Sequence, residues 1–375
     1  MNRAGEYINA LFGNAAYKAY RPNPLPPFPE LIMDEEMISL LSSAYQSLGR
    51  LDATSELIPD MSLFLGAYVR KEALLSSQIE GTQATLEDVL SPATDAAKNI
   101  DVGDVVNYVN ALDYAIRRMG ELPVCNRLLR DTHRVLMSGV RGQEKNPGEF
   151  RRSQNWIGAQ NSSITTARYV PPTVEDMEAA MSELEKFING DSLDPLLKIA
   201  LVHYQLETIH PFLDGNGRIG RMLIVLMMIS YGILRTPVLY MSLYLKTNRV
   251  EYYDRLGEVR SKGNYEQWVK FFLRGVGETC RDSINAIEAL DRLIRDDGEK
   301  LGRMTAAQKK VFDYLKEHPI IEIGETAKAL SLSYNTVSTA IKKMLSLGIL
   351  GAAETKSRGR VFLYTGYVEI LKLGT

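Results

Sequence analysis

Twelve residues, from His210 to Arg221, combine glycines and charged side chains in a pattern suited to chemistry on phosphate groups. They read HPFLDGNGRIGR. Glycines tolerate positive φ, so backbone N–H groups can converge where the following helix begins and its dipole is positive. Arg218 and Arg221 lie three residues apart, share a helix face and can fork onto phosphate oxygens. Because two arginines at a helix N-terminus oppose the macrodipole, the pattern predicts a bound polyanion.

Two further side chains of the stretch complete a reactive site. Asp214 is a hard oxygen ligand, and Mg²⁺ is commonly held by one or two carboxylates together with phosphate oxygens. His210 lies at the end of the preceding helix, where its imidazole can take a proton from an incoming nucleophile. The residues therefore predict magnesium-assisted transfer of a phosphate-containing group.

Three alternatives account for parts of the pattern. The glycines of residues 215–220 fit GxGxxG, but a dinucleotide-binding turn follows a strand, and this one follows a helix. Glu207 and His210 form an ExxH pair, but a di-iron bundle needs two such pairs and the chain has only four histidines. A capped turn beside a buried histidine would explain Gly215 but not the two arginines.

The stretch resembles the Fic motif, HPFx[D/E]GNGRxxR, of the Fic (filamentation induced by cAMP) protein adenylyltransferases, and every defining position matches. The similarity extends from about residue 104 to residue 290. It implies that His210 deprotonates a Tyr, Thr or Ser hydroxyl of a target protein, which then takes AMP from ATP as pyrophosphate leaves. Asp214 would hold Mg²⁺. The residues implied for nucleotide binding are Gly215, Asn216, Gly217, Arg218, Ile219, Gly220, Arg221 and Tyr253, with Glu80 reaching the same site.

The resemblance also suggests how target and adenosine are bound. Residues 164–170 of the flap would register the target segment by main-chain pairing. Asn248, Tyr252 and Tyr253 match positions that line the adenosine pocket of relatives. An aromatic pair at this spacing fits core packing equally well, so the assignment of Tyr253 stays open.

A second motif predicts an internal inhibitor. SSQIEG contains Ser76, Glu80 and Gly81 and matches the [S/T]xxxE[G/N] inhibitory motif of Fic proteins. Glu80 in the last helical turn opposes the macrodipole, so a cation should face it. The resemblance names Arg221, whose guanidinium would then be withheld from the γ-phosphate. A surface glutamate before a helix-ending glycine is the alternative.

The surrounding sequence is mostly helical. Apolar spacing predicts helices from about residue 34, from 60 to 79, after Thr85, and over 104–119, 126–138, 174–189, 194–209 and 217–232. Residues 148–172 carry β-branched residues and turns, which predict a hairpin or flap. Five prolines between Pro22 and Pro29 predict an extended polyproline segment, either a strap across a domain surface or an SH3-type ligand.

The last 73 residues form a separate basic module. Helices over 305–317, 324–330 and 333–347, followed by a hairpin, suggest a winged helix. Residues 303–375 hold 11 Lys+Arg and 6 Asp+Glu, or +5, whereas the whole chain has a net charge of −2. In that interpretation Tyr334, Asn335, Thr336 and Thr339 face a DNA groove, and Lys342, Lys343, Lys356, Arg358 and Arg360 meet phosphates. Winged helices also bind proteins, so the partner stays open.

Length and composition bound the rest. With 375 residues, 45% hydrophobic and 24% charged, the chain is typical of a folded protein of two or three domains. Two distant cysteines support neither a disulfide framework nor a zinc module, and no apolar run is long enough for a membrane span. We therefore expect a cytoplasmic location without membrane contact; a homodimer stays open.

The expected fold is mainly α: a Fic-type helical core with a β-hairpin flap, plus a small C-terminal winged-helix (α+β) domain. The expected domains are 1–100, a helical region with the proline-rich strap and inhibitory helix, 101–300, the catalytic core, and 303–375. One alternative function is a nucleotide-sensing, DNA-binding transcription regulator. The other is a Fic enzyme that transfers UMP, phosphate or phosphocholine.

Overall fold

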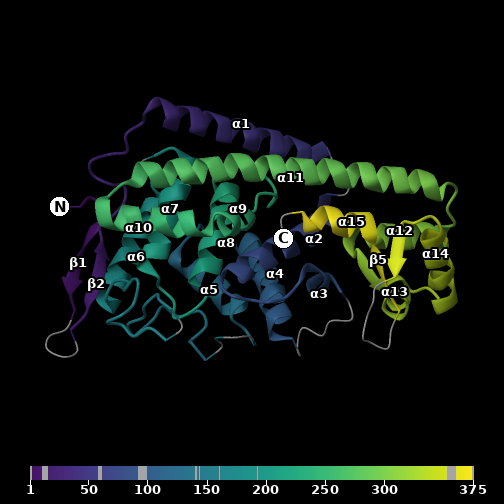
Figure 1. Ribbon diagram of the computed structural model, residues 1–375, viewed down its shortest axis with the longest axis horizontal. Coiled ribbons are helices and arrows are strands. Elements are labelled where there is room, and N and C mark those ends of the chain that lie inside the picture. Colours follow the sequence, from purple (N-terminus) through teal and green to yellow (C-terminus); the bar gives the residue numbers. More distant parts are fainter. Residues whose placement is uncertain are drawn as a thin grey trace. The chain divides into compact units, whose positions relative to one another are not determined.

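A computed structural model describes residues 2–10, 16–57, 61–91, 99–139, 142, 144–159, 161–191, 193–352 and 360–373 (Figure 1). The chain divides into two compact units. The first comprises residues 1–49 and 110–279, and the second residues 50–109 and 280–375. Three helices have residues in both units: α1 (Glu35–Leu57), α4 (Ile100–Arg118) and α11 (Tyr265–Leu301). Within the described residues, no helix is long and apolar enough to cross a membrane.

The first unit is built around two helices that pack against each other, α7 (Pro195–Ile209) and α8 (Asn216–Ser230). Asp194 caps α7 by accepting the N–H groups of Leu196 and Leu197. Every residue of α8 from Asn216 to Met228 is buried, as the nearly all-apolar sequence predicts. Around this pair lie α5 (Asn126–Leu136), α6 (Val174–Asn189), α9 (Ser242–Thr247) and α10 (Arg249–Lys262).

An N-terminal hairpin belongs to the same unit and was not predicted. Strands β1 (Gly5–Asn9) and β2 (Lys18–Pro22) pair antiparallel, with Tyr7 opposite Tyr20. The backbone N–H of Tyr20 also donates to the carbonyl of Val170, at 3.0 Å. Because these strands are short, their local sequence carries too little alternation to mark them.

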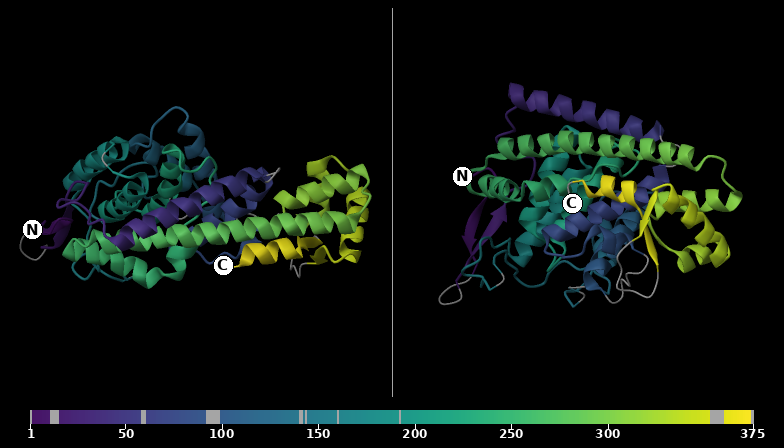
Figure 2. Two further views of the ribbon diagram at one scale, coloured as in Figure 1. Left: turned by 90° about the horizontal axis from the view of Figure 1, so that it is seen from above. Right: turned by 45° about the vertical axis from the view of Figure 1, so that its right-hand side comes forward.

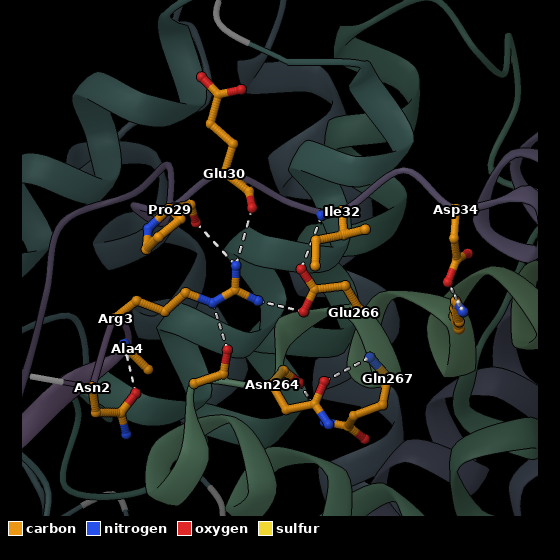
Figure 3. Close-up of polar contacts among 12 residues, drawn as sticks. Asn2, Arg3, Ala4, Pro29, Glu30, Ile32, Asp34, Asn264, Glu266 and Gln267 are labelled. Carbon is orange, nitrogen blue, oxygen red and sulfur yellow. Dashed lines mark hydrogen bonds and ion pairs between the residues drawn. The ribbon is translucent and has the colours of Figure 1, made fainter.

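The proline-rich segment is a strap, as one of the two interpretations predicted, but it is irregular and contains two cis X-Pro bonds instead of a regular polyproline helix. Figure 3 shows how it is held: the Arg3 guanidinium donates to the carbonyls of Pro29 and Glu30 and pairs with the Glu266 carboxylate. Glu266 in turn accepts the N–H of Ile32. These bonds fix the strap on the N-terminal end of α11.

The second unit joins the predicted inhibitory helix to the C-terminal module. Helix α2 (Met61–Ile79) packs against α12 (Ala306–Glu317) and α15 (Thr365–Lys372). The buried Lys71 ammonium donates to the carbonyl of Leu373 at 2.7 Å. Thr85 caps α3 (Leu86–Leu90) as predicted, with Asp88 completing the capping box.

The predicted three helices and hairpin of the C-terminal module are present: α12, α13 (Ile323–Leu330), α14 (Tyr334–Ser346) and the pair β4 (Leu350–Ala352) and β5 (Val361–Tyr364). A further strand, β3 (Ile320–Glu322), completes an antiparallel sheet in the order β3-β5-β4. Figure 2 shows this group of elements from two further directions. The β3 strand and helix α15 were not predicted, because each is too short to show a clear period.

Candidate active site

The short connection between α7 and α8 carries the reactive residues, and its ends are set by two left-handed residues. His210 ends α7 with φ 51° and ψ 62°, and its N–H donates to the carbonyl of Leu206. Gly215 precedes α8 with φ 76° and ψ 4°. A Cβ on Gly215 would lie 3.0 Å from Sδ of Met137 and 3.3 Å from Nε2 of His133, so this position needs glycine.

Asn216 locks the connection from inside. Its Oδ1 accepts the N–H of Phe212 and its Nδ2 donates to the Phe212 carbonyl, each at 2.8 Å. Both side-chain groups are therefore used on the loop itself. Any contribution of Asn216 to anion binding would come from its backbone N–H, as the sequence predicted for the glycine turn.

The two arginines of the motif are buried in the first turns of α8. Arg218 and Arg221 are only 5% and 2% exposed. Nη2 of Arg218 lies 3.8 Å from Oδ1 of Asp214, and the same nitrogen donates a hydrogen bond to Sδ of Met137 at 3.4 Å. Both guanidinium groups thus lie close to the N-terminus of α8, as the spacing predicted; their role in phosphate binding stays a prediction.

Asp214 faces cations on two sides. Besides Arg218, the Lys145 ammonium lies 3.2 Å from its Oδ2. The backbone approaches closely as well, because a Cβ on Gly142 would lie 2.9 Å from the same oxygen. Lys145 was missed in the sequence, since it lies 69 positions from Asp214 and only the fold brings them together.

His133 supports the same loop although it lies outside the motif. Its Nδ1 accepts the N–H of Gly148 at 2.9 Å, so its proton is on Nε2, which donates to the Asp214 carbonyl at 3.0 Å. The ring stacks on Phe212 with centroids 3.9 Å apart. Burial lowers the pKa of His133 to about 4, which keeps the ring neutral.

His203 lies deeper in the core. Its Nδ1 meets the carbonyl of Gly220 and its Nε2 the hydroxyl of Tyr252, each at 3.0 Å, and burial lowers its pKa to about 4. The contacts are those of a packing residue. Tyr252, 1% exposed and bonded to His203, is therefore part of the core.

Comparisons with known proteins agree with this geometry. Residues 38–117 match the model of the Fic/DOC family N-terminal domain, and residues 123–228 match that of the Fic/DOC family. The chain therefore contains a Fic domain, preceded by the N-terminal domain of the same family. The matched Fic domain includes the whole His210–Arg221 motif, helix α7 and all but the last two residues of α8.

Named relatives support the same assignment. The chain is 35% identical over 127 residues to Protein adenylyltransferase Fic of Aedes aegypti, covering 33% of this chain and 22% of that protein. It is 28% identical over 253 residues to the protein of that name from Drosophila persimilis, covering 64% of this chain and 45% of that protein. The matched region thus spans less than half the length of either relative.

Two solved structures share the fold. A Fic family protein from Desulfovibrio desulfuricans covers 89% of this chain and 97% of its own, with a TM-score of 0.57 and 19% identity. A Fic domain containing signaling protein from Bacteroides thetaiotaomicron covers 65% of this chain and 95% of its own, with a TM-score of 0.52 and 19% identity.

The Fic flap forms little regular β-structure in its described residues. A single bridge joins Ile157 and Tyr169, with N–H···O distances of 2.8 and 3.0 Å. A turn follows Ser163, and the Tyr169 hydroxyl donates to the carbonyl of Thr208 at 2.6 Å. The Tyr169 hydroxyl thus ties the flap to the end of α7, two residues before His210.

Tyr253 is the fifth residue of α10. The guanidinium groups of Arg168 and Arg249 lie 6.0 and 5.8 Å from its ring centroid, and Arg168 also pairs with Asp254. The ring of Tyr253 is half-buried, and its centroid lies 4.9 Å from that of the Tyr252 ring. Its predicted role in adenosine binding stays a prediction.

The predicted inhibitory motif ends α2 in the second unit. Ser76 is fully buried, and Glu80 lies one residue beyond the last helical residue, Ile79. The N–H groups of Glu80 and Gly81 donate to the carbonyls of Ser77 and Gln78, and Gly81 has φ 102°. Glu80 and Arg221 belong to different units, and their pairing is considered below as a proposal.

Proposed function

We propose that this protein is an adenylyltransferase that moves AMP from ATP to a Tyr, Thr or Ser hydroxyl of a target protein. The observation that carries the proposal is the juxtaposition of His210 with a glycine turn and the two buried arginines of α8. The names of the relatives support the same chemistry.

His210 would accept the proton of the target hydroxyl, whose oxygen then attacks the α-phosphorus. The P–O bond to the β-phosphate breaks, and pyrophosphate leaves. Backbone N–H groups of the glycine turn would stabilise the added charge on the α-phosphate, and Arg218 and Arg221 would hold the β- and γ-phosphates.

Asp214 suits a magnesium ion that is shared with the nucleotide. Its carboxylate is 31% exposed and already faces two cationic groups, Lys145 and Arg218. Within the described ranges, no group of three or more His, Cys, Asp or Glu side chains could hold a metal ion alone. This fits Mg²⁺, which neutralises phosphate charge and takes most of its ligands from water and phosphate oxygens.

The proposal is tested by incubating the protein with ATP and Mg²⁺ and locating AMP adducts by mass spectrometry. His210→Ala should abolish the adduct while ATP still binds, whereas His318→Ala, in the second unit, should leave it unchanged. Competition by UTP, and label transferred from the γ-phosphate, separate AMP transfer from transfer of UMP or phosphate. ATP binding without any adduct, on this protein or in lysates, would favour the nucleotide sensor.

We further propose that Glu80 inhibits the transfer by pairing with Arg221. Glu80→Gly should then raise self-modification with labelled ATP. Glu369→Gly, which removes an exposed carboxylate from α15 of the same unit, is the matched control. Unchanged transfer by the Glu80 variant, with ATP still bound, would refute the inhibitory role. Removal of AMP by the same site is tested with a pre-modified target.

A DNA-binding role for residues 303–375 is the second candidate. Ser333 caps α14, and Tyr334 is 55% exposed at its first turn beside the exposed Asn335. Lys342 is exposed further along the same helix; Lys356 and Arg358 lie outside the described residues. Duplex binding should weaken with salt and with Lys342→Ala, and no binding at low salt would remove this candidate.

A further inference from the structure

We propose that Arg151 is a positioning residue that couples the flap to the catalytic histidine. This inference rests on the proposed function, in which His210 is the base and the flap receives the target. Nothing in the motif itself points to Arg151, which lies 59 residues before His210.

The Arg151 side chain is 1% exposed and bonds only to backbone carbonyls among the described residues. Nε donates to the carbonyl of His210 at 3.0 Å, Nη2 to that of Pro172 at 2.5 Å, and Nη1 to that of Ser153 at 3.4 Å. Its backbone N–H donates to the carbonyl of Pro211 at 2.8 Å. One guanidinium therefore joins three separate points of the backbone.

A buried cation that has no carboxylate partner among the described residues costs free energy. Burial accordingly lowers the pKa of Arg151 to about 10. An apolar side chain of similar length would avoid burying a charge, but it would leave the carbonyls of His210, Ser153 and Pro172 without this donor. The planar fork fixes the direction of each carbonyl that it binds. The arrangement therefore orients these carbonyls.

The carbonyl that Arg151 binds belongs to a residue in an unfavourable conformation. His210 is left-handed without being glycine, so the surroundings must hold it there. Asn155 helps, because its Nδ2 donates to the carbonyls of His210 and Phe212, at 3.3 and 3.0 Å. Its Oδ1 is buried without a partner among the described residues, so Asn155 also accepts a cost to make these bonds.

Ser153 and Pro172 lie near the two ends of the flap. A target segment that displaces the flap would therefore move the Arg151 guanidinium and, with it, the His210 backbone. The glycine turn is held by other groups, namely His133 and Asn216. Loss of Arg151 should thus impair transfer and leave nucleotide binding largely intact.

The experiment compares Arg151→Met with Arg152→Met, which removes the exposed neighbouring arginine. Transfer is measured at saturating ATP, in the wild type and in the Glu80→Gly background, and the Kd of ATP by calorimetry. We expect Arg151→Met to lower transfer about 100-fold with an ATP Kd within about two-fold, and Arg152→Met to change neither. Arg151→Lys, which keeps the charge, should recover part of the rate.

A second readout does not need activity. In protein labelled with ¹³C-histidine, the His210 imidazole signal should shift or broaden in Arg151→Met and return toward the wild type in Arg151→Lys, while the His203 signal stays in place. If Arg151→Met fails to fold, the Lys variant carries the same comparison. The proposed function fails if the wild type transfers nothing, but the imidazole signals still decide the positioning role. Equal losses of ATP affinity and transfer, or an unaltered His210 signal, would overturn it.

Discussion

The stability of the first unit should depend on pH through His133, and the size of this effect follows from its burial. In the folded protein the pKa of His133 is lowered to about 4, whereas an unfolded chain has the ordinary value of about 6.5. Between these values the unfolded state binds the proton and the folded state does not. The contribution of His133 to the stability of the folded unit is therefore fully present above pH 6.5 and is lost as the pH falls toward 4.

The magnitude can be worked from these values. At pH 5 the unfolded histidine lies about 1.5 pH units below its pKa, and each unit corresponds to about 1.4 kcal/mol. His133 should therefore remove about 2 kcal/mol from the free energy of unfolding between pH 7 and pH 5. That is a substantial share of the 5–15 kcal/mol typical of a folded protein.

The assay is urea unfolding at pH 7, 6 and 5, followed by tryptophan fluorescence. Both tryptophans of the chain, Trp156 and Trp268, belong to the first unit, so the signal reports on that unit. His133→Gln should be less stable than the wild type at pH 7, and the difference should shrink by about 2 kcal/mol at pH 5. All other titrating groups are common to both proteins and cancel in the comparison.

Two controls test the reasoning. His203→Gln should behave like His133→Gln, because burial lowers the pKa of His203 to about 4 as well. His318→Gln lies in the second unit and should leave the tryptophan transition unchanged. A difference in unfolding free energy between wild type and His133→Gln that is constant from pH 7 to pH 5 would refute a buried, neutral His133.

Three further predictions concern single contacts. Lys145→Met removes the ammonium that lies 3.2 Å from Oδ2 of Asp214. The apparent Mg²⁺ affinity of the ATP-bound protein, measured by calorimetry, should therefore rise up to about five-fold. An unchanged or weaker affinity would contradict competition between the ammonium and Mg²⁺ for this carboxylate. Gly220→Ala places a Cβ 2.7 Å from Oε1 of Glu207. It should lower the free energy of unfolding of the first unit in urea by about 1–3 kcal/mol. An unchanged free energy of unfolding would show that the helices move apart to make room, against this prediction. Thr305→Ala removes the capping box of α12 and should cost about 1 kcal/mol in thermal unfolding of the second unit, unless the cap is dispensable.

The local features of the fold were readable because they depend on neighbouring residues. The bounds of α6 were predicted to the residue, and those of α7 to within one, since Thr173 and Asp194 cap them and Pro195 opens α7. Gly81 was expected to end a helix, and the glycine turn was expected to tolerate positive φ; Gly81 and Gly215 both adopt it. Each of these assignments uses information within about four residues.

What the sequence did not reveal depends on contacts between distant positions. Arg151, His133 and Lys145 support the catalytic loop from 59, 81 and 69 positions away, and none of them belongs to a recognisable spacing. His133 in particular has the apolar helical surroundings of an ordinary core residue. Its function as a support follows only from where α5 packs against α8.

The loop of the active site combines features that each cost free energy. His210 and Gly215 are both left-handed, and three arginines, Arg151, Arg218 and Arg221, are at most 5% exposed. Asp214 lies 3.8 Å from one of them, Arg218. Left-handed backbone and buried charge are costly, so the surrounding structure must hold this loop in place. Under the proposed function, the N–H groups of the glycine turn and the guanidinium groups of α8 would bind the triphosphate next to the imidazole of His210.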